Sequence, residues 1–240
     1  MTFTLTALGT ATPYPRPDRA CSGYLLSTPT TRVWVDAGPG SLANLQRHTT
    51  PDRLDAVWIS HTHADHTADL LPTYYALLHA DLTPTRPLPL YGPPGLAHRL
   101  ETFLASTGPN PAHAAFEVHE LHDGHRADVG DLTLTSHAVQ HGLPAFGLRA
   151  THGDRTLAYS GDTGPCPALH ALAAGADLLL CEADGTDPSP VHCTPEDAAD
   201  AARSAGRLLI THIGHTLTEA QATERAGAPA AHDHETHQVG

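Results

Sequence analysis

Lysine is absent from this chain of 240 residues, and arginine supplies all 13 of its basic side chains. Against them stand 26 acidic residues, so the formal net charge is −13 with neutral histidines. An acidic surface repels polyanions over a Debye length, which is about 8 Å at physiological salt. Read along the sequence, no run of arginines offers the several neighbouring cations that neutralise a nucleic-acid backbone. The charge pattern therefore disfavours long nucleic acid as a partner.

Long apolar runs and paired cysteines are also missing. No apolar stretch is long enough for a membrane span, and no charged segment precedes an apolar one at the amino terminus, so neither a membrane span nor a secretory signal is indicated. The four cysteines show no C-x-x-C spacing, which favours free buried thiols in a reducing compartment. We therefore expect a cytoplasmic protein without a membrane partner. Hydrophobic residues make up 40% of the chain, enough for the core of a single domain spanning residues 1–240.

Patterns of period 2 and of period 3.6 alternate along the chain. They predict strands at about 2–8, 22–28, 31–36, 56–60, 88–91, 115–119, 131–139, 145–151, 155–160, 176–181 and 207–212. They predict helices at about 40–48, 67–80, 94–105, 165–174, 195–205 and 217–226. Three histidines of the tail, His232, His234 and His237, could trap a metal, but the alternation at 231–239 also fits a final edge strand. The order of elements suits two facing sheets covered by helices.

Histidine is abundant, and six consecutive residues carry the strongest signal in the chain. Residues 61–66 read His-Thr-His-Ala-Asp-His and directly follow an apolar run, which predicts a strand that ends in a loop. Imidazole and carboxylate groups at this density suit borderline-soft divalent metals, above all zinc. Because side chains at i and i+2 of an extended loop point the same way, His61 and His63 can hold one ion. After the turn, Asp65 and His66 can reach a second ion.

Three later strand ends offer the additional ligands that a pair of metal ions needs. The alternating segment 132–142 contains two histidines, His137 and His141, before the chain turns. Asp162 follows an apolar strand and precedes a glycine turn, and His212 ends a strand of the buried type. The sequence therefore holds enough distant ligands to complete a two-metal site.

These motifs together resemble those of the metallo-β-lactamase-fold hydrolases, and more narrowly those of the ribonuclease Z-related phosphodiesterase branch. Beside the histidine loop, the resemblance is carried by Leu-Gly-Thr-Ala-Thr-Pro at 8–13, Val-Trp-Val-Asp-Ala-Gly at 33–38, His-Cys-Thr-Pro at 192–195 and Leu-Ile-Thr-His-Ile at 209–213. It runs from about residue 3 to about residue 214. The family implies an α/β fold, an αββα four-layer sandwich, and it implies a homodimer.

The resemblance also implies a role for each candidate ligand. The expected site holds two divalent ions, with His61, His63 and His141 for the first, Asp65, His66 and His212 for the second, and Asp162 bridging both. A carboxylate can bridge because it has two oxygens. His141 is preferred to His137 because it immediately precedes the next strand of the family pattern. The histidine-rich set favours Zn²⁺, although Mn²⁺ or Fe²⁺ can occupy nitrogen and oxygen sites of this kind.

The catalytic expectations concern three residues. The resemblance makes His192 the general acid or a phosphate-contacting histidine, a task that suits imidazole at neutral pH; the alternative is a cap residue before the helix at 195–205. Glu182 could orient His192 through a carboxylate–imidazole hydrogen bond. Asp65 is expected to orient the nucleophilic water as well as to bind metal. Asp36 is expected to anchor metal-binding histidines rather than to act as a catalyst.

The reaction that the resemblance implies is hydrolysis of a phosphodiester by a hydroxide held between two zinc ions. Family members that process tRNA carry a flexible arm, rich in glycine and proline, between the third and fourth metal motifs. Here His141 and Asp162 are only 21 positions apart, which leaves room for two strands and a turn. With the acidic charge, this favours small or cyclic nucleotide-like diesters as substrates. Two alternatives stay open, a tRNA 3′-end processing endonuclease and a non-catalytic zinc-binding protein.

Overall fold

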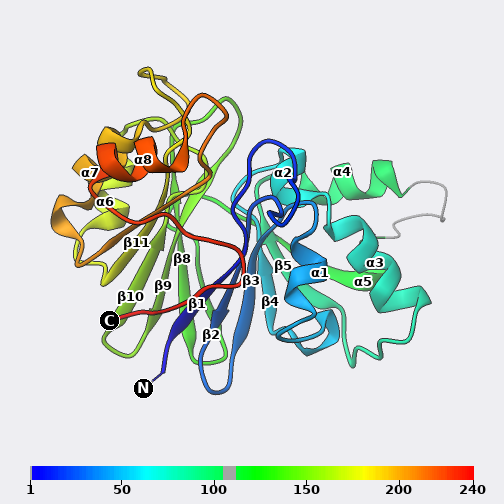
Figure 1. Cartoon of the computed structure of the whole chain (residues 1–240). Helices are drawn as coiled ribbons and strands as arrows, with labels where there is room; N and C mark the ends of the chain where they lie inside the picture. The colour runs from blue at the N-terminus through cyan, green and yellow to red at the C-terminus, as the bar shows by residue number, and fades with distance from the viewer. Residues whose placement is uncertain (1, 105–111) are drawn as a thin grey trace.

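Two β-sheets pack face to face, and helices cover their outer sides (Figure 1). This arrangement confirms the expected αββα sandwich. The computed structural model describes residues 2–104 and 112–240. Two predictions reach beyond the described residues: the last residue of the helix at 94–105, and the parts of the single domain 1–240 at residue 1 and at 105–111. Within the described ranges, no helix is both long and apolar enough to cross a membrane.

The strands fall into two mixed sheets. The first has the order β13-β1-β2-β3-β4-β5-β6, with β1 (Thr4–Gly9), β2 (Gly23–Ser27), β3 (Arg32–Ala37), β4 (Ala56–Trp58), β5 (Leu88–Gly92), β6 (Phe116–Glu120) and β13 (Thr236–Gln238). The second has the order β12-β11-β10-β9-β8-β7, with β7 (Arg126–Val129), β8 (Leu132–Ala138), β9 (Phe146–His152), β10 (Arg155–Tyr159), β11 (Leu178–Glu182) and β12 (Leu208–Thr211). The tail forms the expected edge strand, because β13 pairs antiparallel with β1.

Helices cover each sheet on the side away from the other sheet. Around the first sheet lie α1 (Ser41–Leu45), α2 (Ala64–Thr67), α3 (Leu70–His79), α4 (Leu96–Phe103) and α5 (Ala112–Ala115) (Figure 1). Over the second lie α6 (Pro167–Ala173), α7 (Pro195–Ala201) and α8 (Glu219–Ala226). The sequence pattern missed α2 and α5, since four residues are too few to show a helical period.

A capping box begins α7. The Thr194 hydroxyl accepts a hydrogen bond from the Asp197 backbone N–H, and the Asp197 carboxylate accepts one from the Thr194 N–H. Pro195 occupies the first helical position, where its missing N–H costs nothing. The cap fixes the start of α7 and thus the short segment just before it, which carries His192.

Strand direction explains where the site forms. In the first sheet β3, β4 and β5 run parallel, and in the second β10, β11 and β12 run parallel. The carboxyl ends of parallel strands meet at one edge of a sheet. Loops that leave these ends therefore bring chemistry from distant parts of the sequence together. Beneath that edge, an apolar layer between the sheets holds Tyr24 and Tyr159 with ring centroids 5.1 Å apart.

Candidate metal centre

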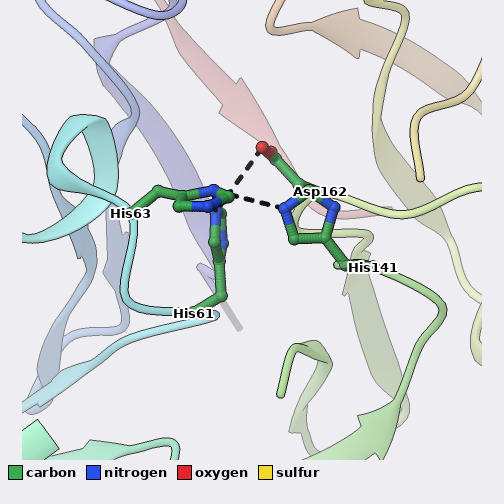
Figure 2. A group of neighbouring side chains, drawn as sticks. All are labelled: His61, His63, His141 and Asp162. Atoms are coloured by element: carbon green, nitrogen blue, oxygen red, sulfur yellow. Dashed lines mark hydrogen bonds and ion pairs between the residues drawn. The ribbon is translucent and has the colours of Figure 1, made fainter. Parts of the chain in front are cut away.

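The first group of candidate ligands comes from three separate loops. Figure 2 shows His61, His63, His141 and Asp162 pointing toward one another from the segments after β4, β8 and β10. The His61 Nε2 and His63 Nδ1 atoms lie 3.0 Å apart, and His141 Nε2 lies 3.2 Å from the same His63 atom. One ligand atom from each of the four residues lies within 4.8 Å of all the others. His63 is exposed, so this group is open to solvent.

A second group lies deeper and consists of Asp65, His66 and His212, all of them buried. The Nε2 atoms of His66 and His212 are 3.3 Å apart. The Asp65 Oδ2 atom lies 3.4 Å from His212 Nε2 and 3.7 Å from His66 Nε2. The short α2 helix makes this possible, because it carries Asp65 and His66 on consecutive positions directly after the extended His61–His63 segment.

Asp162 stands between the two groups. Its Oδ2 atom lies 3.6 Å from His61 Nε2 in the first group. Its Oδ1 atom lies 3.3 Å from His66 Nε2 and 3.4 Å from His212 Nε2 in the second. Among the described residues, this buried Oδ1 accepts no hydrogen bond. A carboxylate with one oxygen directed at each group is therefore suited to bridge two cations.

The charges of the cluster show why cations fit it. Burial opposes charge on His66, but Asp162 and Asp36 outweigh burial and raise the pKa of His66 well above its usual value. Burial likewise opposes charge on Asp162, but His212 and His66 outweigh it and hold the pKa of Asp162 well below its usual range. Burial, and then His66, lower the pKa of His61. Buried carboxylates thus require positive charge beside them, and divalent ions held by these imidazole and carboxylate donors would supply it.

Asp36 anchors the second group from behind. Its Oδ2 accepts hydrogen bonds from His66 Nδ1 at 2.7 Å, from the Tyr159 hydroxyl at 2.7 Å and from Ser60 Oγ at 2.8 Å, while its Oδ1 accepts one from the Ser60 N–H at 2.7 Å. Because Nδ1 of His66 is engaged by Asp36, its Nε2 is left for an ion. The contact expected between Asp36 and the candidate ligands is therefore present at His66. The sequence reasoning missed Tyr159, whose only signal was its place three residues before Asp162.

Two residues of this network have an unusual backbone. Asp36 has a φ of 54° and His212 a φ of 50°, both in the left-handed region. This conformation costs about 1–3 kcal/mol for a residue with a Cβ atom, so it persists only where surrounding contacts hold it. At Asp36, these contacts are the hydrogen bonds to His66, Tyr159 and Ser60. The two strained residues are thus Asp36, which anchors the candidate ligand His66, and His212, which is itself a candidate ligand.

The Asp36 network leads to a prediction about Tyr159. Tyr159→Phe removes one hydrogen bond from Asp36 and loosens the orientation of His66, so we expect the metal dissociation constant to rise about tenfold. Tyr24→Phe is the matched control, because the Tyr24 hydroxyl is also buried but contacts Thr211 at 2.7 Å instead of Asp36. Competition with a chromophoric chelator measures the metal dissociation constant of both variants. Equal metal affinity in Tyr159→Phe and Tyr24→Phe would show that Tyr159 does not position His66.

His192 lies beside the ligands and is held by Glu182. The His192 Nδ1 atom is 3.1 Å from Glu182 Oε2, and Glu182 Oε1 accepts a hydrogen bond from the Thr163 N–H at 2.5 Å. One ring nitrogen of His192 lies within 4.8 Å of the ligand atoms of Asp162 and His212. Burial, followed by Asp162, raises the pKa of Glu182 well above its usual range, and burial lowers the pKa of His192. Burial thus disfavours the charged form of each of the two groups.

The nine residues given a catalytic or metal-binding role from the sequence meet at this edge of the sandwich: His61, His63, Asp65, His66, His141, Asp162, Glu182, His192 and His212. Their roles in catalysis and metal binding stay predictions. The structure brings His141 into the cluster and leaves His137 outside it. His137 lies on β8 and pairs with Gly147 on β9. A further contact, from His141 Nδ1 to the Val191 carbonyl at 2.8 Å, turns His141 Nε2 toward His63.

Comparisons with known proteins fit this arrangement. Residues 31–213 match the family described as Beta-lactamase superfamily domain. The uncharacterized protein Rv1339 of Mycobacterium tuberculosis is 37% identical over 219 residues, covering 87% of this chain and 80% of its own. A ribonuclease Z of Mycobacterium sp. (strain KMS) is 31% identical over 256 residues, covering 95% of this chain and 90% of its own. The metallo-beta-lactamase fold protein YhfI from Bacillus subtilis superposes with a TM-score of 0.85 at 24% identity, covering 99% of this chain and 100% of its own.

Proposed function

This chain belongs to the β-lactamase superfamily and to its ribonuclease Z-like branch, and we propose that it is a metal-dependent phosphodiesterase that hydrolyses small or cyclic nucleotide-like diesters. One observation carries the proposal above all others. Two ligand groups share Asp162, and a histidine that takes no part in the shortest ligand contacts, His192, lies next to them. This arrangement supports a site that binds a phosphoryl group and delivers a proton.

The metal ions would be zinc, with manganese or iron as chemically acceptable replacements. The first would be held by His61, His63 and His141, the second by Asp65, His66 and His212, with Asp162 shared between them. When bound, such ions supply Lewis acidity toward phosphoryl oxygens and lower the pKa of water. The exposed His63 side leaves the first group accessible to a substrate.

His192 would deliver the proton that the leaving oxygen needs. Nδ1 of His192 is hydrogen-bonded to Glu182, which fixes the ring and leaves Nε2 to donate a proton. When Nε2 of the protonated ring donates to the leaving oxygen, the ring becomes neutral and keeps its contact with Glu182 through Nδ1. Asp65, buried beside His212, would accept a hydrogen bond from the attacking water and set its direction.

The length of the segment between His141 and Asp162 supports a small substrate. The segment contains β9 and β10, which pair antiparallel and leave only residues 153–154 as their turn. No arm extends from this part of the chain to hold a folded RNA. A compact diester can enter on the exposed side of His63 without such support.

A substrate panel tests the proposal. We expect metal-dependent hydrolysis of bis(p-nitrophenyl) phosphate and of cyclic nucleotides by the purified, zinc-loaded chain, with precursor tRNA cleaved far more slowly. Removal of the metal by a chelator should abolish turnover, and added Zn²⁺ or Mn²⁺ should restore it. A chain that binds zinc tightly but hydrolyses none of these diesters would instead be a non-catalytic zinc-binding protein.

A second candidate is tRNA 3′-end processing. It is favoured by the relatives named ribonuclease Z, which share 31% of their residues over nearly the whole chain. Without an arm, such an activity would need a homodimer or another subunit to grip the RNA. Efficient, salt-sensitive cleavage of precursor tRNA at its 3′ end would place this activity first.

A further inference from the structure

Three arginines from two separate parts of the chain surround one hollow of about 410 Å³. Arg16 and Arg19 lie in the loop between β1 and β2, and Arg47 follows α1. Ala20, Gly40, Asn44 and His234 line the same hollow. Because Arg47 is distant in the sequence from the loop that carries Arg16 and Arg19, only the fold brings the three arginines together.

The charge of this hollow opposes that of the whole protein. Its lining has three arginines against one carboxylate, Asp18, while the chain carries a net charge of −13. In the described part of the chain, carboxylates pair with other arginines: Arg126, Arg155, Arg203 and Arg225. Asp233 is nearby, but its two oxygens accept hydrogen bonds from the Thr10 hydroxyl, the Ala20 N–H and Asn44. The guanidinium groups of the hollow are therefore available to an anion from outside.

The arginines are also held in place. Arg16 and Arg19 exchange two backbone hydrogen bonds of 2.8 and 3.0 Å, which close the turn between them. The guanidinium of Arg16 lies 3.9 Å above the ring centroid of Tyr14. Arg19 donates from Nη2 to the Thr10 hydroxyl at 3.3 Å, while its buried Nε has no acceptor among the described residues. These contacts fix Arg16 and Arg19 without an ion pair to a carboxylate among the described residues.

The hollow shares a wall with the metal centre. Gly40 and Ala20, which line it, are so close that a Cβ atom at Gly40 would lie 3.0 Å from that of Ala20. The neighbouring residues Cys21 and Gly38 pack against the backbone of a candidate ligand, Asp65. A Cβ atom at Gly38 would lie 2.7 Å from Cys21 Cβ and 2.0 Å from the Asp65 carbonyl oxygen. Residues 20–21 and 38–40 therefore separate the arginines from Asp65.

We infer that this hollow is a phosphate-binding site beside the metal centre. Arginine forks match phosphate oxygens with paired N–H donors, and aromatic rings next to them accept stacked groups. The phosphate can belong to a small anion or to a nucleic-acid backbone, and the chemistry of recognition is the same. The binding of phosphate in this hollow does not depend on the proposed function.

Titration of the zinc-loaded, ¹⁵N-labelled full chain tests the site without turnover. Inorganic phosphate is one probe and a single-stranded RNA of ten nucleotides is the other, and the Nε–H signals of the arginines report binding by NMR. The wild-type chain should show saturable shifts of Arg19. Arg16→Ala with Arg47→Ala should weaken binding about tenfold or more, because two charged donors are lost.

The matched control removes the same charge elsewhere, by Arg126→Ala with Arg203→Ala, both exposed and paired with aspartates. This variant should bind phosphate as the wild type does. Tighter binding of RNA than of phosphate, with strong salt dependence, identifies the nucleic-acid backbone as the ligand; equal or weaker binding identifies a small anion. No saturable shift with either probe, or an equal loss in both double variants, would overturn the site. Because binding is read directly, an inactive enzyme would leave this result interpretable.

Discussion

Asp162→Asn is expected to lower metal-dependent phosphodiester turnover by about a thousandfold or more. The change keeps the shape of the side chain but removes the negative charge between the two ligand groups. In the wild-type chain the Asp162 oxygens lie 3.6 Å from His61 on one side and 3.3 Å from His66 on the other. An amide offers one oxygen instead of two and replaces the other with an N–H group, so it cannot bridge two cations.

Metal content distinguishes this effect from simple loss of structure. We expect Asp162→Asn to retain less than the wild-type amount of metal after gel filtration, with an unchanged far-ultraviolet circular dichroism spectrum. His137→Asn is the matched control, since His137 lies at the same edge of the second sheet but outside the cluster. If Asp162→Asn kept full turnover and full metal content, the bridging role would be wrong.

His192→Ala is expected to reduce kcat by about 10²–10⁴-fold for diesters with poor leaving groups, while metal content stays unchanged. The reason is that an alkoxide such as a ribose oxygen must take up a proton as it leaves. A p-nitrophenolate leaves without that help, so hydrolysis of bis(p-nitrophenyl) phosphate should fall much less. The comparison of the two substrates in one variant isolates proton delivery from phosphate binding.

Glu182→Gln serves as a second test of the same pair. The amide introduced by this substitution would keep a side-chain hydrogen bond to His192 but would carry no negative charge to favour the protonated ring, so the loss should again be larger for the poor leaving group. The pH dependence of kcat should change in Glu182→Gln with the alkoxide-leaving substrate only. An equal loss for both substrates in His192→Ala would show that His192 binds phosphate and does not donate the proton.

The local part of the site could be predicted from the sequence because its residues are neighbours. Six consecutive positions hold His61, His63, Asp65 and His66. The alternation of side chains in the extended loop and the turn that follows it set the directions of these side chains. The distant ligands needed the family resemblance to be assigned. The choice of His141 over His137 depended on the strand that follows His141 in the family pattern, and the structure shows that His137 pairs with β9.

Contacts that cross between the sheets could not be predicted in this way. Tyr159 reaches Asp36 across 123 positions of sequence, and no local pattern marks that pair. The arginine hollow is assembled from the β1–β2 loop, the end of α1 and the segment before β13. Such groups follow from the packing of whole sheets, which composition and period do not specify. Most strands and helices did follow from the patterns, because strong alternation and helix caps act locally.

Anomalous diffraction at the zinc absorption edge, on crystals of the zinc-loaded chain, tests the central claim most directly. We expect two neighbouring peaks at the edge of the sandwich, one against His61, His63 and His141 and one against Asp65, His66 and His212, with the Asp162 carboxylate between them. A single peak with Asp162 turned away, or metal bound only at the histidines of the carboxyl-terminal tail, would contradict it.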